Sequence, residues 1–216
     1  MSKQKLVTIV DAGSGNLLSV LRACEKVGST PKVTTNADDV LAAERLILPG
    51  VGAFGHVMDE ISKRGLKDVI RRFVETGRPY LGICVGMQIM LDESHEFGRH
   101  EGLGLIPGVV EAIPDTNLEG TRHKIPHIGW SQLSFPDALD SRPSLFSGVS
   151  AGESVYFVHS FVARPENFSN VAASTRYNGL DLCAAVRDGP LWGCQFHPEK
   201  SGPSGLRVLQ NFIEFT

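Results

Sequence analysis

The 216-residue sequence lacks the features that direct a protein to nucleic acid or to a membrane. It has no run of Lys or Arg and a net charge of −3, which gives no reason to expect a nucleic-acid or anionic-membrane partner. No stretch approaches the roughly 20 apolar residues of a membrane-spanning helix, and the first residues lack a signal-peptide pattern. We therefore expect a cytoplasmic location.

The sequence is also poor in cysteine, and its cysteines are not spaced as metal or redox sites. None forms a C-x-x-C pair, so the sequence predicts no metal site, no redox pair and no cofactor; the four are Cys24, Cys84, Cys183 and Cys194. His123 and His127 have a metal-ligand spacing only on a helix, and Pro126 disfavours a helix there. Cys24, Cys183 and Cys194 lie in apolar runs and are interpreted as small core residues.

Internal repeats, low-complexity tracts and linkers are absent, so we expect one domain over residues 1–216. Strands are expected at 6–10, 31–35, 45–48 and 80–83, alternating with helices at 17–27, 38–43 and 85–93. A further helical stretch is expected from the 49–55 loop through Glu75, with a break near Gly65. Beyond Gly98, strand candidates at 108–113, 154–163, 171–175, 182–187 and 191–196 precede a helix over 204–215. The pattern predicts an α/β fold with a mostly parallel central sheet flanked by helices and a strand-rich second half.

One cysteine stands where an expected strand turns abruptly into an expected helix. In Gly82-Ile83-Cys84-Val85-Gly86, the glycines remove Cβ atoms that would clash in so sharp a turn. This is the cysteine version of the nucleophile elbow, which projects its side chain above the sheet. A thiol at a helix N-terminus is favoured as the thiolate. The motif alone fits a buried cysteine beside a tight turn equally well.

A cysteine nucleophile needs a base, and His197 is the strongest candidate. Pro198 disfavours helical backbone at His197, so we expect an extended segment in which His197 and Glu199 point the same way. The carboxylate of Glu199 could then orient the imidazole, as the third member of a catalytic triad does. The alternative is that His-Pro-Glu is a polar helix start with an acid near its N-terminus.

The third requirement is a pair of donors for an oxyanion. The backbone N–H of Val85, directly after the nucleophile, supplies one. The glycine-rich loop at 49–55, with Val51 and Gly52 at its centre, follows a strand and can turn N–H groups toward a ligand. The alternatives are an ordinary turn or a phosphate cradle, although the Lys-Ser/Thr ending of a P-loop is missing.

Taken together, these motifs resemble the class I (triad) glutamine amidotransferases. Four further motifs, at 11–17, 48–55, 126–130 and 156–161, resemble one subfamily, the glutaminase subunits of imidazole glycerol phosphate synthase in histidine biosynthesis. Ala12 stands where that subfamily commonly has an aromatic residue, and Ser131 where it commonly has Asn. A triad glutaminase of the pyridoxal phosphate synthase type and a non-catalytic interaction subunit of the same fold are the alternatives.

The resemblance implies roles for individual residues. Cys84 would attack the side-chain amide of glutamine, with His197 and Glu199 as base and orienter. Gln88 and Glu96 would recognise the α-amino end of the substrate, and the backbone around His159 and Ser160 its carboxylate. Gln88 also lies one helical turn from Cys84 and so faces the same side, whereas the sequence gives His159, inside an apolar strand, as a structural histidine by default.

The resemblance also implies a partner, a separate (βα)8-barrel cyclase subunit that receives the ammonia. A barrel of that kind needs about 250 residues, so this chain cannot contain it as well. Asn16 and Trp130 are the candidates for the docking face, and a core position is the alternative for Trp130.

Overall fold

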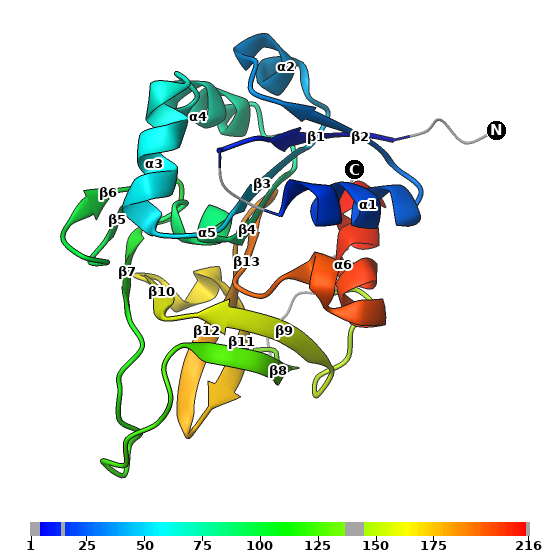
Figure 1. Ribbon diagram of the computed structural model, residues 1–216. Helices are drawn as coiled ribbons and strands as arrows, with labels where there is room; N and C mark the ends of the chain where they lie inside the picture. Colours follow the sequence, from blue (N-terminus) through cyan, green and yellow to red (C-terminus); the bar gives the residue numbers. More distant parts are fainter. Residues whose placement is uncertain (1–4, 14–15, 137–144, 215–216) are drawn as a thin grey trace.

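The computed structural model describes residues 5–13, 16–136 and 145–214. A nine-stranded sheet crosses the molecule (Figure 1). From one edge to the other its strands are β2 (Thr30–Thr34), β1 (Leu6–Val10), β3 (Leu46–Gly50), β4 (Tyr80–Cys84), β13 (Leu191–Cys194), β12 (Leu180–Asp188), β11 (Val171–Tyr177), β8 (His127–Ser134) and β9 (Ser154–His159).

The strand directions divide this sheet into two parts. The pairings from β2 to β13 are parallel, and those from β13 to β9 are antiparallel. The antiparallel part follows from tight turns such as Asn178-Gly179, where both residues have positive φ, as a two-residue hairpin requires. A smaller second sheet contains, in order, β10 (Phe161–Pro165), β7 (Gly108–Ala112), β5 (Glu93–Ser94) and β6 (His100–Glu101).

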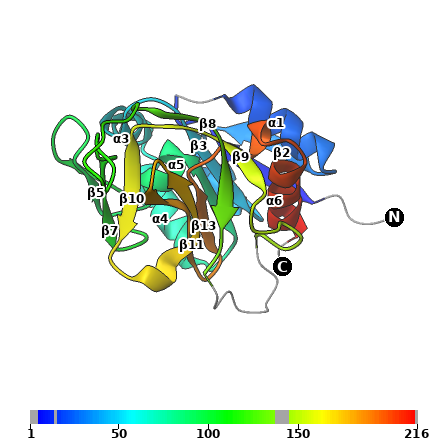
Figure 2. The ribbon, with the colours of Figure 1, turned by 90° about the horizontal axis from the view of Figure 1, so that it is seen from below.

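Helices cover both faces of the parallel part, which confirms the predicted α/β class. On one side α1 (Leu17–Lys26) packs against α6 (Gly202–Glu214), and on the other α2 (Ala37–Ala42) packs against α4 (Lys67–Glu75) (Figures 1 and 2). The remaining helices are α3 (Phe54–Lys63), the short α5 (Val85–Gln88) and the 3-10 turns η1 (Phe168–Asn170) and η2 (Pro198–Lys200). The predicted break near Gly65 is confirmed between α3 and α4. None of the helices in the described ranges is long and apolar enough to span a membrane.

The helix expected over 85–93 is wrong beyond Gln88, because the next carbonyl groups bond to another part of the chain. The carbonyls of Ile89 and Met90 accept hydrogen bonds from the N–H groups of Leu103 and Leu105, both at 2.8 Å. These tertiary bonds replace the bonds that would have continued the helix. Only one helical turn therefore follows Cys84.

Two strand predictions also need correction. The strand expected over 154–163 is two strands in different sheets, because the Ser160 carbonyl accepts from Ile113 N–H at 2.9 Å in the second sheet. Strand β8 was not predicted at all. Its apolar residues Ile128 and Trp130 face outward and are exposed. The alternation of apolar and polar residues that usually marks a buried strand face is therefore no guide to this strand.

The strands that lead into the elbow are the most buried part of the sheet. Every residue of β3 and β4 is buried, as expected for parallel strands covered on both faces. Their register pairs Leu48 with Gly82 and Gly50 with Cys84. The end of β3 is thereby fixed beside the end of β4.

We predict that Gly86→Ala destabilises the protein strongly, because a Cβ at this position would overlap the backbone carbonyl of Leu48. Overpacking against a rigid backbone costs about 3 kcal/mol or more of unfolding free energy, which urea unfolding measures. Gly77→Ala is the control, since its φ is +72° but no atom lies within 4 Å of the added methyl group; it should cost about 1–2 kcal/mol. Equal losses in the two variants would contradict the close-packing argument.

Candidate active site

The sulfur of Cys84 is presented by a strained turn between β4 and α5. Cys84 has φ 56° and ψ −115°, a conformation that L-residues rarely adopt. A Cβ at Gly82 would overlap the carbonyl of Gly86, and one at Gly86 would overlap that of Leu48. The predicted reason for the two glycines, removal of clashing Cβ atoms, is confirmed.

His197 and Glu199 form a buried pair next to this sulfur. The Nδ1 of His197 lies 2.8 Å from Oε1 of Glu199, and both side chains are almost fully buried. Glu199 is in η2 rather than in an extended segment, so the carboxylate reaches the ring around a tight turn. The extended segment expected through Glu199 is therefore wrong, and the short helix start, which was the alternative interpretation, itself brings the acid to the imidazole.

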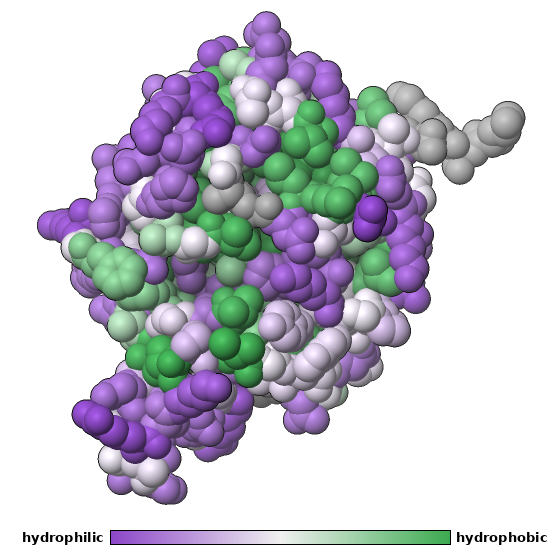
Figure 3. Space-filling view, in the orientation of Figure 1, coloured by the Kyte–Doolittle hydropathy of each residue, from purple (hydrophilic) through white to green (hydrophobic). Residues whose placement is uncertain are grey.

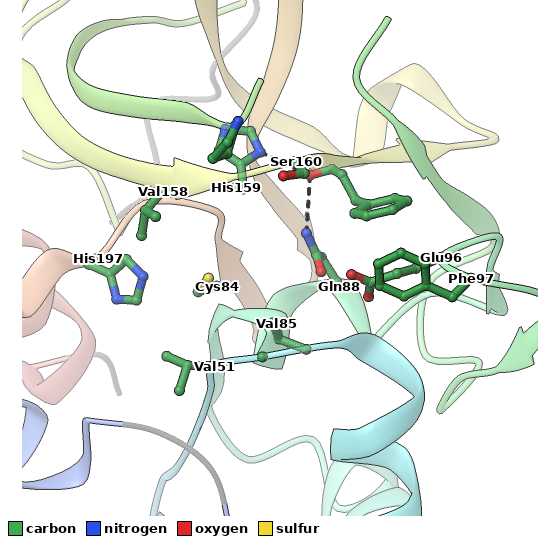
Figure 4. Close-up of a pocket in the computed structure, with 13 residues that line it drawn as sticks. Val51, Cys84, Val85, Gln88, Glu96, Phe97, Val158, His159, Ser160 and His197 are labelled. Atoms are coloured by element: carbon green, nitrogen blue, oxygen red, sulfur yellow. Dashed lines mark hydrogen bonds between the residues drawn. The ribbon is translucent and has the colours of Figure 1, made fainter. Parts of the chain in front are cut away.

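The other ring nitrogen of His197 faces the cysteine. Nε2 is buried and makes no hydrogen bond of ordinary geometry with any described residue, and Figure 4 shows the ring beside the Cys84 sulfur. Burial lowers the pKa of His197, but the Cys84 sulfur and the Glu199 carboxylate outweigh burial and raise the pKa to about 9. At neutral pH this arrangement favours the imidazolium form of His197.

A cavity of about 500 Å³ opens in front of Cys84. It brings together nine of the predicted site residues, namely Val51, Gly52, Cys84, Val85, Gln88, Glu96, His159, Ser160 and His197. Glu199 does not line this cavity and lies behind His197. Asn16 and Trp130 also lie outside it. The structure thus gathers residues from both halves of the chain around one sulfur atom (Figure 4).

The wall nearest the elbow is made of backbone. Because Gly50 pairs with Cys84, the residues that follow β3, Val51 and Gly52, begin beside Val85. Gly52 has φ +104°, a conformation that glycine adopts readily. Val85 is the first residue of α5, and the N–H groups of a first turn have no partner within their own helix. Backbone donors are therefore available on this side of the sulfur.

The opposite end of the cavity carries polar oxygens. Gln88 donates through Nε2 to the carbonyl of Phe161 at 3.1 Å and to Oε1 of Gln195 at 3.0 Å, which leaves its own oxygen without a hydrogen bond among the described residues. Oε2 of Glu96 accepts from Phe54 N–H at 2.5 Å, at the start of α3. In Figure 4 the side-chain oxygens of Gln88 and Glu96 lie near each other, so this end suits a cationic group.

A pair of buried histidines supports the cavity from behind. His127 Nδ1 lies 2.9 Å from His159 Nε2, and His159 Nδ1 lies 2.9 Å from the carbonyl of Phe161. Since the carbonyl only accepts, His159 donates to it and receives a hydrogen bond from His127. Burial lowers the pKa of both rings to about 4, so both are neutral near pH 7. The structural reading of His159 is borne out by these contacts, whereas the role of His127 was missed.

The other three cysteines differ from Cys84 in their surroundings. All are buried in the core, and burial raises the pKa of Cys24 and Cys183 to about 12 and that of Cys194 further still. Such thiols stay protonated and unreactive. Within the described ranges, no three His, Cys, Asp or Glu side chains are grouped so that they could hold a metal ion.

Both predicted docking residues lie on the surface. Trp130 is 57% exposed, so the core alternative for this residue is wrong, and Asn16 is exposed at the start of α1. Ile128 and Val51 are also exposed apolar residues. Figure 3 shows hydrophobic surface in the middle of this face, between the helices above and the strands below. A surface of this kind is typical of contact with another protein.

Phe97 at the cavity wall and the buried amide of Gln195 were not among the predicted site residues. Phe97, strongly exposed and with φ 54°, lies edge-on to Phe161 at 6.1 Å at the cavity wall. Gln195 is fully buried beside Cys84. The signal for Gln195 was present in the sequence, because an amide in an otherwise apolar strand, two residues before His197, needs a buried polar partner.

We predict that Cys84→Ala lowers the pKa of His197, because the imidazolium loses the sulfur that stabilises it. An NMR titration of the imidazole resonance, assigned by its disappearance in His197→Asn, should show a midpoint clearly below about 9. Cys183→Ala removes a thiol elsewhere in the core and should leave the titration unchanged. An unaltered midpoint in Cys84→Ala would show that the sulfur does not interact with the ring.

Comparison with known proteins places this geometry in a family. Residues 8–215 match the family model of class-I glutamine amidotransferases. The chain is 44% identical over 209 residues to an imidazole glycerol phosphate synthase subunit HisH 1 of Legionella pneumophila (strain Lens), covering 96% of this chain and 98% of that protein. It is 47% identical to the HisH subunit of Syntrophotalea carbinolica, with the same coverage.

Solved structures agree on the fold. The structure of PurLQS from Thermotoga maritima superposes with a TM-score of 0.72 at 22% identity, over 99% of each chain. A glutamine amidotransferase crystal structure superposes with a TM-score of 0.71 at 22% identity, over 96% of this chain and 97% of the other. The match to the family model and the 44–47% identity to HisH subunits over nearly the whole chain show that the chain belongs to the class-I glutamine amidotransferases and, within them, to the glutaminase subunits of imidazole glycerol phosphate synthase.

Proposed function

We propose that Cys84, His197 and Glu199 are the residues with which this glutaminase subunit hydrolyses glutamine. The observation that carries the proposal is the 2.8 Å contact between His197 Nδ1 and Glu199 Oε1, behind a sulfur raised on a strained turn at the cavity floor. The carboxylate fixes the ring so that Nε2 faces the sulfur, which is the role of a triad orienter. This intact geometry favours catalysis over a purely structural role.

The reaction proceeds through a thioester. The Cys84 thiolate attacks the side-chain carbonyl carbon of glutamine, and the oxyanion that forms accepts hydrogen bonds from Val85 N–H and the 51–52 segment. His197 gives its Nε2 proton to the leaving nitrogen, and ammonia departs as the C–N bond breaks. The neutral imidazole then removes a proton from water, whose oxygen attacks the thioester and releases glutamate and the thiolate.

The polar end of the cavity holds the rest of the substrate. The α-ammonium group of glutamine binds between the Gln88 oxygen and the Glu96 carboxylate, since both are acceptors and one is anionic. Its α-carboxylate binds backbone at His159 and Ser160, on the far side of the cavity. These contacts place the side-chain amide of glutamine over the sulfur.

The subunit acts together with a partner synthase subunit, and we propose that this partner is a (βα)8-barrel cyclase. Ammonia released into water would be protonated and lose its nucleophilicity, so it must pass directly to the partner. Docking uses the exposed surface around Asn16 and Trp130. We take residues 1–216 as one glutaminase domain, with the barrel on a separate chain.

We predict that Cys84→Ala in complex with the cyclase abolishes synthesis from glutamine and leaves synthesis from free ammonia intact. Loss of the nucleophile should reduce glutamine-dependent synthesis at least about a thousandfold, whereas the ammonia-dependent reaction does not use the thiol. Product formation from each nitrogen source measures the two activities. Retained use of glutamine would remove Cys84 from its proposed role.

We also predict that Trp130→Ala weakens binding to the cyclase. An exposed tryptophan at the centre of an interface contributes about 2 kcal/mol or more, which corresponds to at least about thirtyfold in affinity. Titration calorimetry with the purified cyclase measures this change. Phe168→Ala is the matched control, because Phe168 is another exposed aromatic residue outside the proposed face. Equal affinities for Trp130→Ala and the parent protein would exclude this docking surface.

A further inference from the structure

Gln195 is a buried amide beside the nucleophile that the proposed chemistry does not use. It follows β13, is 0% exposed, and its backbone N–H donates to the Ala184 carbonyl at 2.9 Å. Its side-chain Nε2 lies 3.9 Å from the sulfur of Cys84, and its Oε1 accepts from Gln88. A buried amide costs free energy unless it is hydrogen-bonded, so these two contacts explain how the residue is tolerated.

The orientation of this amide is fixed by a backbone group. The Phe161 carbonyl can only accept, so the nitrogen of Gln88 must face it at 3.1 Å. The same Gln88 nitrogen lies 3.0 Å from the side chain of Gln195 and donates its second hydrogen to it, so the Gln195 atom that accepts must be the oxygen Oε1. The nitrogen of Gln195 is therefore the atom that faces the sulfur. A flip of either amide would place two acceptors or two donors in contact.

A donor in this position acts on the charge of the sulfur. An N–H···S contact stabilises a thiolate more than a thiol, because the acceptor is then ionised. The need for such a donor is greater here because α5 has only four residues, far fewer than the helix expected from the sequence. The titratable groups that line the cavity around the sulfur are Glu96, His159 and His197, and Glu199 lies behind His197. Gln195 is thus an uncharged group that favours the ionised sulfur.

We propose that Gln195 is a positioning residue that holds the Cys84 sulfur in place and stabilises its thiolate form, with Gln88 setting the direction of its amide. The proposal rests on the proposed role of Cys84 as nucleophile. It gives Gln88 two tasks, since its nitrogen orients Gln195 while its oxygen is directed to the substrate.

The test is the pH dependence of Cys84 alkylation by iodoacetamide in Gln195→Leu, which keeps the size of the side chain but removes the donor. The midpoint of the rate profile should move to higher pH, and the rate at pH 7 should fall about tenfold or more, as expected for loss of a hydrogen bond to a charged group. Mass spectrometry confirms that Cys84 is the alkylated residue. Gln210→Leu, on α6 and bonded to Glu214, is the control and should keep the parent profile.

Gln195→Glu keeps the test decisive if Gln195→Leu does not fold. It preserves an oxygen for Gln88 but places a second oxygen at the sulfur, so the midpoint should again move upward. An unchanged profile in a folded variant of either kind would overturn the proposal. Alkylation of the free subunit needs neither glutamine nor the cyclase, so failure of this proposal is distinguishable from failure of glutamine-dependent synthesis in Cys84→Ala.

Discussion

The site depends on one close approach, between the Leu48 carbonyl at the end of β3 and the Cα of Gly86 after the elbow. No residue with a side chain fits there, and the parallel register of β3 and β4 holds the two segments together. This contact lets the chain reverse within one residue, so that Cys84 takes a left-handed conformation and its sulfur leaves the sheet. The same register brings the 51–52 segment beside Val85, so the proposed nucleophile and the proposed oxyanion wall arise from one packing constraint.

Burial lowers the pKa of all three histidines around this turn, but the net shift differs because their neighbours differ. His127 and His159 are kept neutral because they are buried and face each other and a carbonyl, with pKa values near 4. His197 is buried as well, yet an anionic carboxylate and the cysteine sulfur raise its pKa to about 9. The neutral ring of His159 and the cationic ring of His197 therefore line the same cavity. The neutral pair can serve as fixed hydrogen-bonding support without competing for the proton that we propose His197 transfers.

The sequence was most predictive where local chemistry decides the structure. The glycines around Cys84 define a sharp turn that appears in the fold. The spacing of His197 and Glu199 brings the two side chains together, but through a 3-10 turn and not through the expected extended segment. The sequence was least predictive where hydrogen bonds to backbone far away along the chain determine the local structure. The helix after Cys84 stops at Gln88 because the carbonyls of Ile89 and Met90 bond to a later loop, and β8 carries its apolar residues outward. Gln195 was missed for a related reason, since its partners lie far away along the chain.

The cavity lies where the parallel and antiparallel parts of the sheet meet, and each part makes a different contribution. The parallel strands β3 and β4 lead into the 51–52 segment and Cys84. The later strands supply His159 and the exposed aromatic surface around Trp130, while β13 leads into Gln195 and His197. Because β13 pairs with β4 on one side and with β12 on the other, it joins the two parts directly behind the sulfur. Gln195 and His197 therefore follow a strand that is hydrogen-bonded to both parts of the sheet.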